Sequence, residues 1–286
     1  MIGSVVRTTG SGLACPDWPL CQGRLIPPLE SHVLIEWFHR LVALLVSLSI
    51  VSLSALTLVS APLRARLGGL AGLLLSLLAT QVLLGALTVW KLLSPAVVSA
   101  HLATALLLFG TLLTLSVRAA AAAEPEAPSG PRPPGLLLAS LAATLLVYAQ
   151  AVLGGVVGSS HAGLACPDWP TCQGQWLPPL QGLVGLHMAH RLGGYAAALM
   201  VMVAALASRA APDPRVRQGA RLASWLVVAQ VALGVANVLL ETPIWVTALH
   251  IATATALLGL LLVTALRVAA LPSGARDVVA LASRAG

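Results

Sequence analysis

Long apolar runs separated by short polar stretches make up most of this 286-residue chain. Each run holds about 20 residues, enough for a helix that rises ~1.5 Å per residue to cross ~30 Å of hydrocarbon. The pattern predicts seven such helices, at residues 37–61, 67–90, 97–117, 135–158, 183–207, 219–240 and 245–268. We therefore expect an all-α fold, a polytopic membrane helical bundle.

The composition indicates that these helices are surrounded by lipid. Only 9% of the residues are charged and 58% are hydrophobic, whereas a soluble domain carries about 25% charged residues. Several of the seven Trp lie near the ends of predicted helices, as interfacial anchors do. The first 30 residues are rich in Gly, Pro and Cys and show no cleavable signal peptide.

The net charge of +7 is unevenly distributed between the two sets of loops. One set, with the C-terminal tail, holds Arg64, Arg66, Arg118, Arg132, Arg209, Arg215, Arg217, Arg221, Arg267, Arg276 and Arg284, and the other holds only Arg7, Arg24 and Lys91. The positive-inside rule predicts a cytoplasmic C-terminus and an extracytoplasmic N-terminus. A nucleic-acid surface would gather its basic residues on one face, so we expect no nucleic-acid partner. Lys91 is the only lysine, and this bias to Arg with abundant Ala favours a bacterial plasma membrane.

An internal repeat divides the chain into two halves. Gly12–Trp18 returns unchanged as Gly163–Trp169, 151 residues later, and His39-Arg40 returns as His190-Arg191. The repeat predicts two pseudo-repeated four-helix halves, at residues 1–118 and 135–270, with a cytoplasmic linker at 119–134 and a cytoplasmic tail at 271–286.

The first half, however, contains only three of its four predicted helices. The counterpart of the 135–158 helix would lie mostly before Met1. We favour a start site placed too far downstream, and a protein with seven helices is the alternative.

Four cysteines lie in two loops predicted to be extracytoplasmic, where disulfides persist. Each loop has a Cys-x5-Cys spacing with prolines and a Trp between the cysteines. Because the repeat makes each loop self-sufficient, we expect the pairs Cys15–Cys21 and Cys166–Cys172, each stabilising its loop by roughly 2–3 kcal/mol. The alternatives are a zinc site, which needs all four thiolates to converge, and a redox-active dithiol in the first loop.

Four histidines share one depth near the extracytoplasmic ends of helices. His39 and His101 lie on alternate, parallel helices of the first half, and His190 and His250 on those of the second. Two imidazoles at equal depth can supply both axial ligands of a haem iron, and small alanines beside His101 and His250 leave room for a porphyrin. The alternative is that each histidine only forms a hydrogen bond with a neighbouring helix. The repetition of the histidines at matching positions in both halves disfavours it.

Arg40 and Arg191 follow their histidines directly, where guanidinium groups can pair with haem propionates. His32 and His161 have no repeat partners and are expected to be solvated. The element Gln-x-x-Leu-Gly occurs at Gln81, Gln150 and Gln230, and we interpret it mainly as close helix packing.

Glu36 distinguishes the two halves. It lies three residues before His39, on the same helix face, and a carboxylate in a membrane helix is usually functional. A solvated interfacial carboxylate is the alternative. The matching position in the second half is His187. The difference predicts chemistry in the first half and a held cofactor in the second.

Together these motifs resemble haem A synthase, the membrane enzyme that completes haem A for cytochrome oxidases. The resemblance extends from Gly3 to about Leu266. Its motifs are Arg7-Thr-Thr-Gly-Ser-Gly-Leu-Ala-Cys-Pro-Asp-Trp-Pro19, Glu36-x-x-His-Arg40, His101-x-Ala-Thr-Ala105, His190-Arg191 and His250-x-Ala-Thr-Ala254. The family is expected to have eight helices, so the missing opening helix is a departure from it.

The resemblance implies an oxidoreductase that converts the C8 methyl of haem O to a formyl group through hydroxylated intermediates. His39 and His101 would then frame the haem O substrate, with Glu36 as catalytic residue. His190 and His250 would ligate the iron of a resident haem b cofactor.

The Cys15–Cys21 pair is similar to a family pair that assists substrate delivery or electron exchange. Candidate partners are a haem O synthase, an electron acceptor such as a quinone, and further copies of the chain. Two other functions compete: a b-type di-haem membrane electron-transfer cytochrome, and a haem transporter or chaperone. The difference between Glu36 and His187 favours the enzyme over both.

Overall fold

The computed structural model describes residues 2–123 and 130–274. Its secondary structure is helical, and within these residues seven helices are long and apolar enough to cross a membrane. The helices are α1 (Ile2–Thr8), α2 (Ser31–Val59), α3 (Ala61–Trp90), α4 (Pro95–Ala123), α5 (Leu136–Ser159), α6 (Gly182–Ala207), α7 (Pro214–Leu239) and α8 (Ile244–Ala270), with short 3-10 turns at Ala162–Leu164 and Ser208–Ala210. The prediction of an all-α, multi-pass membrane bundle is confirmed.

Several helices are longer than their apolar runs. The first long helix begins at Ser31 instead of residue 37, and α7 begins at Pro214, where the side chain of Asp213 caps the N–H of Arg215 at 2.7 Å. An apolar run marks the lipid-facing length of a helix, whereas capping residues and proline mark its start. Helix α4 also continues through Ala123, into the predicted linker at 119–134. The rest of that linker from 124 to 129, and the tail from 275 on, lie outside the described residues.

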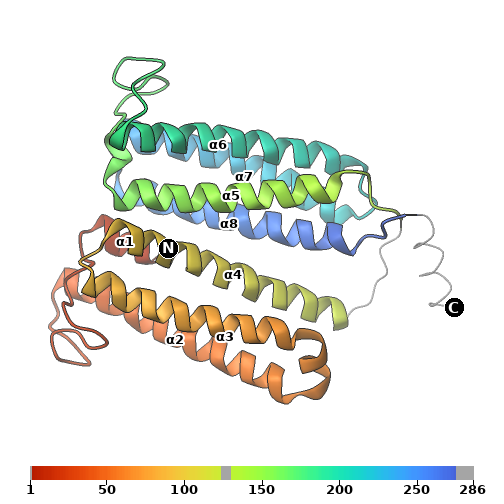
Figure 1. Ribbon diagram of the computed structural model, residues 1–286, viewed down its shortest axis with the longest axis horizontal. Helices are drawn as coiled ribbons and strands as arrows, with labels where there is room; N and C mark the ends of the chain where they lie inside the picture. The colour runs from red at the N-terminus through yellow and green to blue at the C-terminus, as the bar shows by residue number, and fades with distance from the viewer. Residues whose placement is uncertain (1, 124–129, 275–286) are drawn as a thin grey trace.

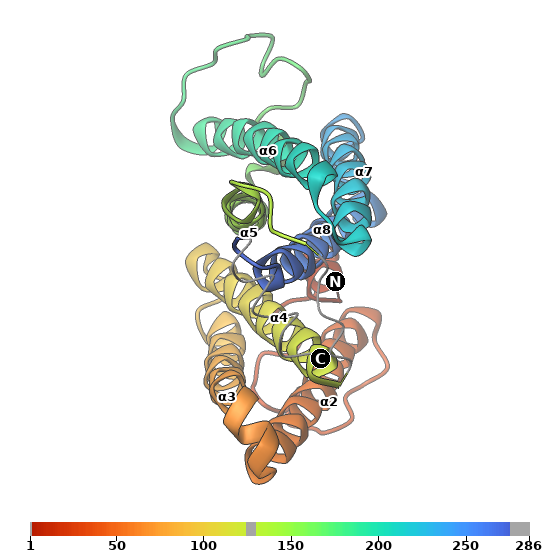
Figure 2. The same cartoon turned by 90° about the vertical axis from the view of Figure 1, so that its right-hand side faces the viewer.

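The long helices lie roughly side by side, and two bundles are visible along their axes (Figures 1 and 2). Helices α5 to α8 form a closed four-helix bundle, and α2, α3 and α4 pack in sequence beside it. The halves meet where α4 packs against α5 and α8. The largest apolar cluster spans this junction and includes Leu106, Val147, Val201, Leu257 and Leu261.

The short helix α1 is the repeat counterpart of the last two turns of α5, since residues 2–8 align with residues 153–159. It packs against α2 and α8. Polar contacts also join the halves here: Arg7 Nη1 donates to the carbonyl of Gly158 at 3.1 Å, and the hydroxyls of Ser99 and Ser159 lie 3.1 Å apart.

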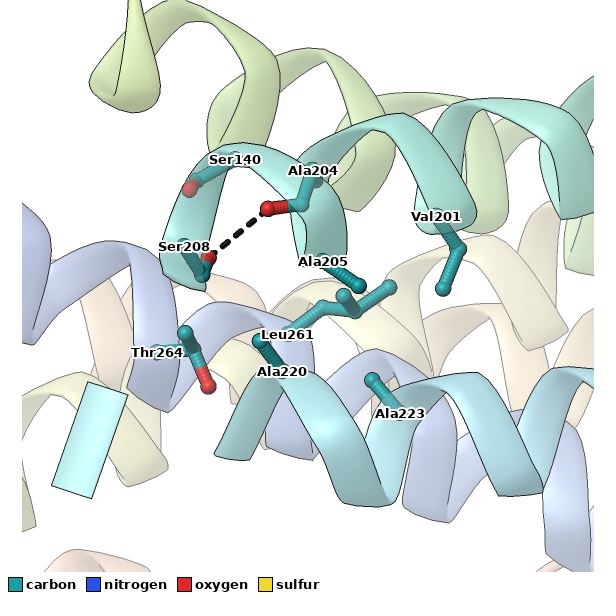
Figure 3. Close-up of a pocket in the computed structure, with 9 residues that line it drawn as sticks. All are labelled: Ser140, Val201, Ala204, Ala205, Ser208, Ala220, Ala223, Leu261 and Thr264. Atoms are coloured by element: carbon teal, nitrogen blue, oxygen red, sulfur yellow. Dashed lines mark hydrogen bonds between the residues drawn. The ribbon is translucent and has the colours of Figure 1, made fainter. Parts of the chain in front are cut away.

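Both disulfide loops lie at one end of the bundle, which we call the loop end (Figure 1). Towards the other end, a cavity of about 10 Å³ lies among Ser140, Val201, Ala204, Ala205, Ser208, Ala220, Ala223, Leu261 and Thr264 (Figure 3). Its volume is about that of one water molecule. It is therefore too small for a cofactor.

Candidate functional site at the loop end

The four predicted ligand histidines occupy matching places in the fold. His39 and His190 are the ninth residues of α2 and α6, and His101 and His250 are the seventh residues of α4 and α8. The structure therefore places His39 and His101, and likewise His190 and His250, near the loop end of alternate helices of one half.

Three of these histidines are contacted by the glutamines of the Gln-x-x-Leu-Gly elements. The amide nitrogen of Gln81 lies 3.2 Å from Nε2 of His101, and that of Gln230 lies 3.2 Å from Nε2 of His250. In each case the Gln and the His come from neighbouring helices. The recurrence of the element was visible in the sequence, but its contact with histidine depends on how the helices are rotated.

The third glutamine makes two contacts to one residue. The Gln150 amide nitrogen lies 2.8 Å from Nδ1 of His190 and donates to the carbonyl of the same residue at 2.6 Å. It thus holds both the ring and the backbone of that histidine.

A glycine faces each of the four imidazoles. For His101, His190 and His250, this glycine is the last residue of a Gln-x-x-Leu-Gly element and follows its glutamine by four residues. A Cβ atom added to Gly85 would lie 3.3 Å from Cε1 of His101, and one added to Gly154 would lie 2.9 Å from Cε1 of His190. The corresponding distances are 3.5 Å for Gly3 and His39, and 3.2 Å for Gly234 and His250. The glycines therefore make room for the rings, which is a more specific role than helix packing.

The imidazoles retain unused binding capacity. Nδ1 of His101 and Nδ1 of His250 are buried without a hydrogen-bond partner, and so are the amide oxygens of Gln81 and Gln230. Buried polar atoms are normally paired. A neutral imidazole with a free nitrogen is a ligand that haem iron accepts, so the chemistry of this donor set fits haem.

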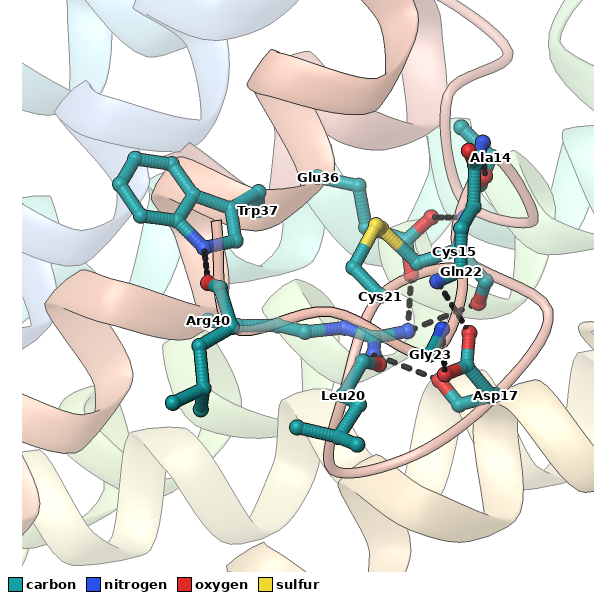
Figure 4. Close-up of a disulfide and its surroundings, with 11 residues drawn as sticks. Ala14, Cys15, Asp17, Leu20, Cys21, Gln22, Gly23, Glu36, Trp37 and Arg40 are labelled. Atoms are coloured by element: carbon teal, nitrogen blue, oxygen red, sulfur yellow. Dashed lines mark hydrogen bonds and ion pairs between the residues drawn. A yellow bond between two sulfur atoms is a disulfide. The ribbon is translucent and has the colours of Figure 1, made fainter. Parts of the chain in front are cut away.

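Glu36 is buried beside the first histidine pair, with 4% of its surface exposed. Its Oε2 accepts a hydrogen bond from the backbone N–H of Cys15 at 2.9 Å, and its Oε1 forms an ion pair with Nη2 of Arg40 at 2.6 Å (Figure 4). The predicted alternative of a solvated interfacial carboxylate is wrong, because both oxygens are held inside the protein.

Arg40 also binds the first disulfide loop. Its two Nη atoms donate to the carbonyls of Cys15, Asp17 and Leu20 at 2.9, 2.7 and 2.5 Å. Arg191 repeats this arrangement with the carbonyls of Cys166, Asp168 and Thr171, each at 2.8 Å. Both guanidinium groups thus fasten a loop to the helix that carries a predicted ligand histidine.

The loops are further closed by one aspartate each. Asp17 accepts from the N–H groups of Gln22 and Gly23 at 2.6 and 2.8 Å, and Asp168 makes the same two contacts with Gln173 and Gly174. The hydrogen bond from the Thr171 hydroxyl, with those backbone N–H groups, lowers the pKa of Asp168 to about 2. Backbone hydrogen bonding, chiefly from Gly23, lowers the pKa of Asp17.

Both cysteine pairs form disulfides within their own loops, Cys15–Cys21 and Cys166–Cys172. The predicted pairing is confirmed and the zinc alternative is wrong, since no thiolate is left free. The described residues contain no cluster of three or more His, Cys, Asp or Glu side chains that could hold a metal ion.

The second half has no acidic group at the place of Glu36. His187 is buried there, and its Nδ1 lies 2.9 Å from the carbonyl of Ala162. Of the two histidines expected to be solvated, His161 is exposed. His32 is exposed too, but its Nδ1 contacts the buried hydroxyl of Ser11 at 3.0 Å, so it belongs to the first loop's hydrogen-bond network.

Comparisons of the sequence with known proteins point to one family. A family model described as "Cytochrome oxidase assembly protein" matches residues 1–34 and 29–262. The haem A synthase of Symbiobacterium thermophilum is 34% identical over 81% of this chain and 78% of its own length. Those of Methylobacterium nodulans and Shewanella oneidensis are 31% and 28% identical, over 91% and 92% of this chain and 85% and 90% of their own lengths. The chain belongs to this family of cytochrome oxidase assembly proteins, the haem A synthases.

Proposed function

We propose that this protein is a haem A synthase, which oxidises the C8 methyl of haem O to a formyl group through hydroxylated intermediates. The observation that carries the proposal is the buried carboxylate of Glu36 beside one histidine pair only. The family membership and the names of the relatives support the same activity.

His39 and His101 would hold the haem O substrate, and His190 and His250 would hold haem b. The free ring nitrogens and the facing glycines support this assignment. When bound, haem b would supply a one-electron redox centre. Gln150 and Gln230 would keep the rings of its two ligands in place, as hydrogen bonds to ligand histidines generally do.

Glu36 would act on the methyl group of the substrate. Arg40 and the Cys15 N–H hold its carboxylate in a buried place. A fixed negative charge can stabilise positive charge that develops on a nearby carbon, or accept a proton from it. Because its partners are preorganised, the carboxylate needs little rearrangement during the reaction.

The positive-inside rule supports an orientation with the loop end extracytoplasmic, in a bacterial plasma membrane. Arg64, Arg209 and Arg215 lie at the opposite end, beside helix termini. The role of Arg40 and Arg191 in binding propionates stays a prediction, since both guanidinium groups bind loop carbonyls here.

The test is co-expression with a haem O synthase in a host that lacks haem A, followed by haem extraction and chromatography. We expect haem A with the native protein, and only haem O with Glu36→Gln while bound haem is retained. A folded, haem-loaded native protein that yields only haem O would contradict the proposal. An electron-transfer cytochrome or a haem transporter would be insensitive to Glu36→Gln.

The haem assignment has its own control. Replacing His250 by Ala should remove the haem b spectrum, whereas replacing His101 by Ala should leave it. If the spectrum survives both changes, haem b is not held by the second-half pair.

A further inference from the structure

Both disulfide loops expose large apolar side chains at equivalent positions. Leu25, Ile26 and Leu29 are 80%, 74% and 85% exposed, and we call these three residues the first apolar tip. Their repeat counterparts, 151 residues later, form the second apolar tip: Trp176, Leu177 and Leu180 are 72%, 91% and 65% exposed. The two halves share this feature although they differ at Glu36 and His187.

The tips are carried by tightly held loops. A disulfide closes each loop, and Arg40 or Arg191 binds three of its carbonyls. Two consecutive prolines lie within each tip segment. The polar backbone is therefore satisfied inward while the apolar side chains point outward, which is costly for residues that face water.

The loops lie beside the helices and do not project far beyond their ends. Trp37 Nε1 donates to the carbonyl of Leu25 at 2.8 Å, and Trp37 is the seventh residue of α2, roughly 9 Å along that helix. In the second loop, Trp169 Nε1 donates to the hydroxyl of Tyr195, well inside α6, at 2.9 Å. Figure 2 shows the second loop extending sideways from the bundle. Leu25 of the first tip thus lies about as deep as Trp37, two residues before His39.

The surface around the tips is already lipid-facing. Phe38 of α2 and Leu183 and Leu192 of α6 are each at least half exposed, at the depth of the loops. Arg24 precedes the first tip directly, as a cation that can meet lipid phosphate. Glu30 follows the first tip at the start of α2, and the second tip lies between the uncharged Gln175 and Gln181. An apolar surface that is continuous with the helices and bordered by polar side chains matches a bilayer interface.

We propose that the two apolar tips insert into the headgroup–acyl boundary of the bilayer at the loop end and act as interfacial anchors. The first anchor belongs to the loop whose Cys15 N–H holds Glu36. Insertion therefore fixes that loop from the lipid side while Arg40 fixes it from the protein side. This inference needs only the membrane location and does not depend on haem.

The anchors can be tested with nitroxide labels on single introduced cysteines. All four native cysteines are in disulfides, so Ile26→Cys and Leu177→Cys each provide one free thiol. Lys91→Cys, in the exposed connection between α3 and α4 at the same end, is the control. Each protein is placed in nanodiscs of zwitterionic and anionic phospholipid, and power-saturation EPR compares accessibility to oxygen and to a water-soluble nickel chelate.

We expect labels at 26 and 177 to favour oxygen over the chelate, and the label at 91 to favour the chelate. If the labels at 26 and 177 were as accessible to the chelate as the label at 91, the tips would lie in water and the proposal would be overturned. Poor access to both reagents at 26 and 177 would place the tips against protein and overturn it as well. Leu29→Cys and Leu180→Cys repeat the measurement if either first variant is not monodisperse.

Discussion

The carboxylate of Glu36 accepts a hydrogen bond from the backbone N–H of Cys15 at 2.9 Å. This contact ties the candidate catalytic residue to the disulfide loop that begins 21 residues earlier. In the second half, the same framework holds His187 against the carbonyl of Ala162. The two loops are therefore alike in construction, but only the first positions a carboxylate.

The first prediction follows from this difference. Changing both Cys15 and Cys21 to Ser removes a bridge that stabilises the loop by roughly 2–3 kcal/mol, so the Cys15 N–H holds Glu36 less firmly. We expect haem A formation to fall about tenfold or more, since ~1.4 kcal/mol corresponds to tenfold in rate. Extracted haems measure this effect in cells that co-express haem O synthase.

The matched control changes Cys166 and Cys172 to Ser. Because that loop carries no carboxylate contact, we expect a smaller effect on haem A formation. An equal loss from both double variants would mean that the disulfides act only through global stability.

The second prediction concerns the ion pair between Arg40 and Glu36. Their side chains are 16% and 5% exposed, and removing one partner of a buried pair costs about 3–5 kcal/mol. We expect Arg40→Gln to abolish haem A formation. Arg40→Lys keeps the charge but loses the two-pronged binding of loop carbonyls, so it should restore only part of the activity.

Arg191→Gln is the comparison for this prediction. It detaches the second loop without exposing a carboxylate, so it should weaken haem b retention more than it affects chemistry at Glu36. Thermal denaturation of all three variants separates a loss of fold from a loss of activity.

Much of the fold could be predicted from the sequence because apolar length and an exact repeat are one-dimensional signals. The seven long helices and the two disulfides follow from such signals. The contacts of Arg40 with three loop carbonyls do not, because they require the folded path of residues 15–20. From the sequence, the position of Arg40 next to His39 suggested only that its guanidinium group pairs with a haem propionate.

The glutamine contacts illustrate the same limit. The three Gln-x-x-Leu-Gly elements were recognisable as a pattern, but pattern alone suggests small-residue packing. Whether Gln150 meets His190 depends on the rotation of α5 against α6. The spacing of four from Gln to Gly was the available signal, since it places both residues on one face of a helix.

The third prediction tests the space that Gly154 leaves for His190. An added Cβ would lie 2.9 Å from Cε1 of that ring, so the imidazole or the helix must shift, at a cost of about 1–3 kcal/mol. We expect Gly154→Ala to lower haem b content in the purified protein, measured by the reduced-minus-oxidised spectrum. Gly72→Ala is the matched control, because nothing lies within 4 Å of its added Cβ. Normal haem b in Gly154→Ala would show that the ring is not confined there.

The last prediction uses the pH dependence of the second loop. The pKa of Asp168 is lowered from 3.8 to about 2, first by the Thr171 hydroxyl and then by backbone N–H groups. A carboxylate with a depressed folded pKa stabilises the fold above its unfolded pKa, and this contribution is lost as the pH falls through the folded pKa. The loop contacts of Asp168 should therefore weaken between about pH 4 and pH 2.

Thr171→Leu should move this transition to higher pH. Leu20 stands at the matching position of the first loop, so the variant gives Asp168 the backbone-only set of donors that Asp17 has. Carboxyl carbon NMR of protein labelled with 13C-aspartate follows the titrations of Asp17 and Asp168 in one sample. The variant Asp168→Asn identifies the signal of Asp168. If Thr171→Leu leaves the midpoint of Asp168 unchanged, the backbone N–H groups of Gln173 and Gly174 are enough to hold its carboxylate, and the hydroxyl contributes nothing to the pH range over which the loop stays closed.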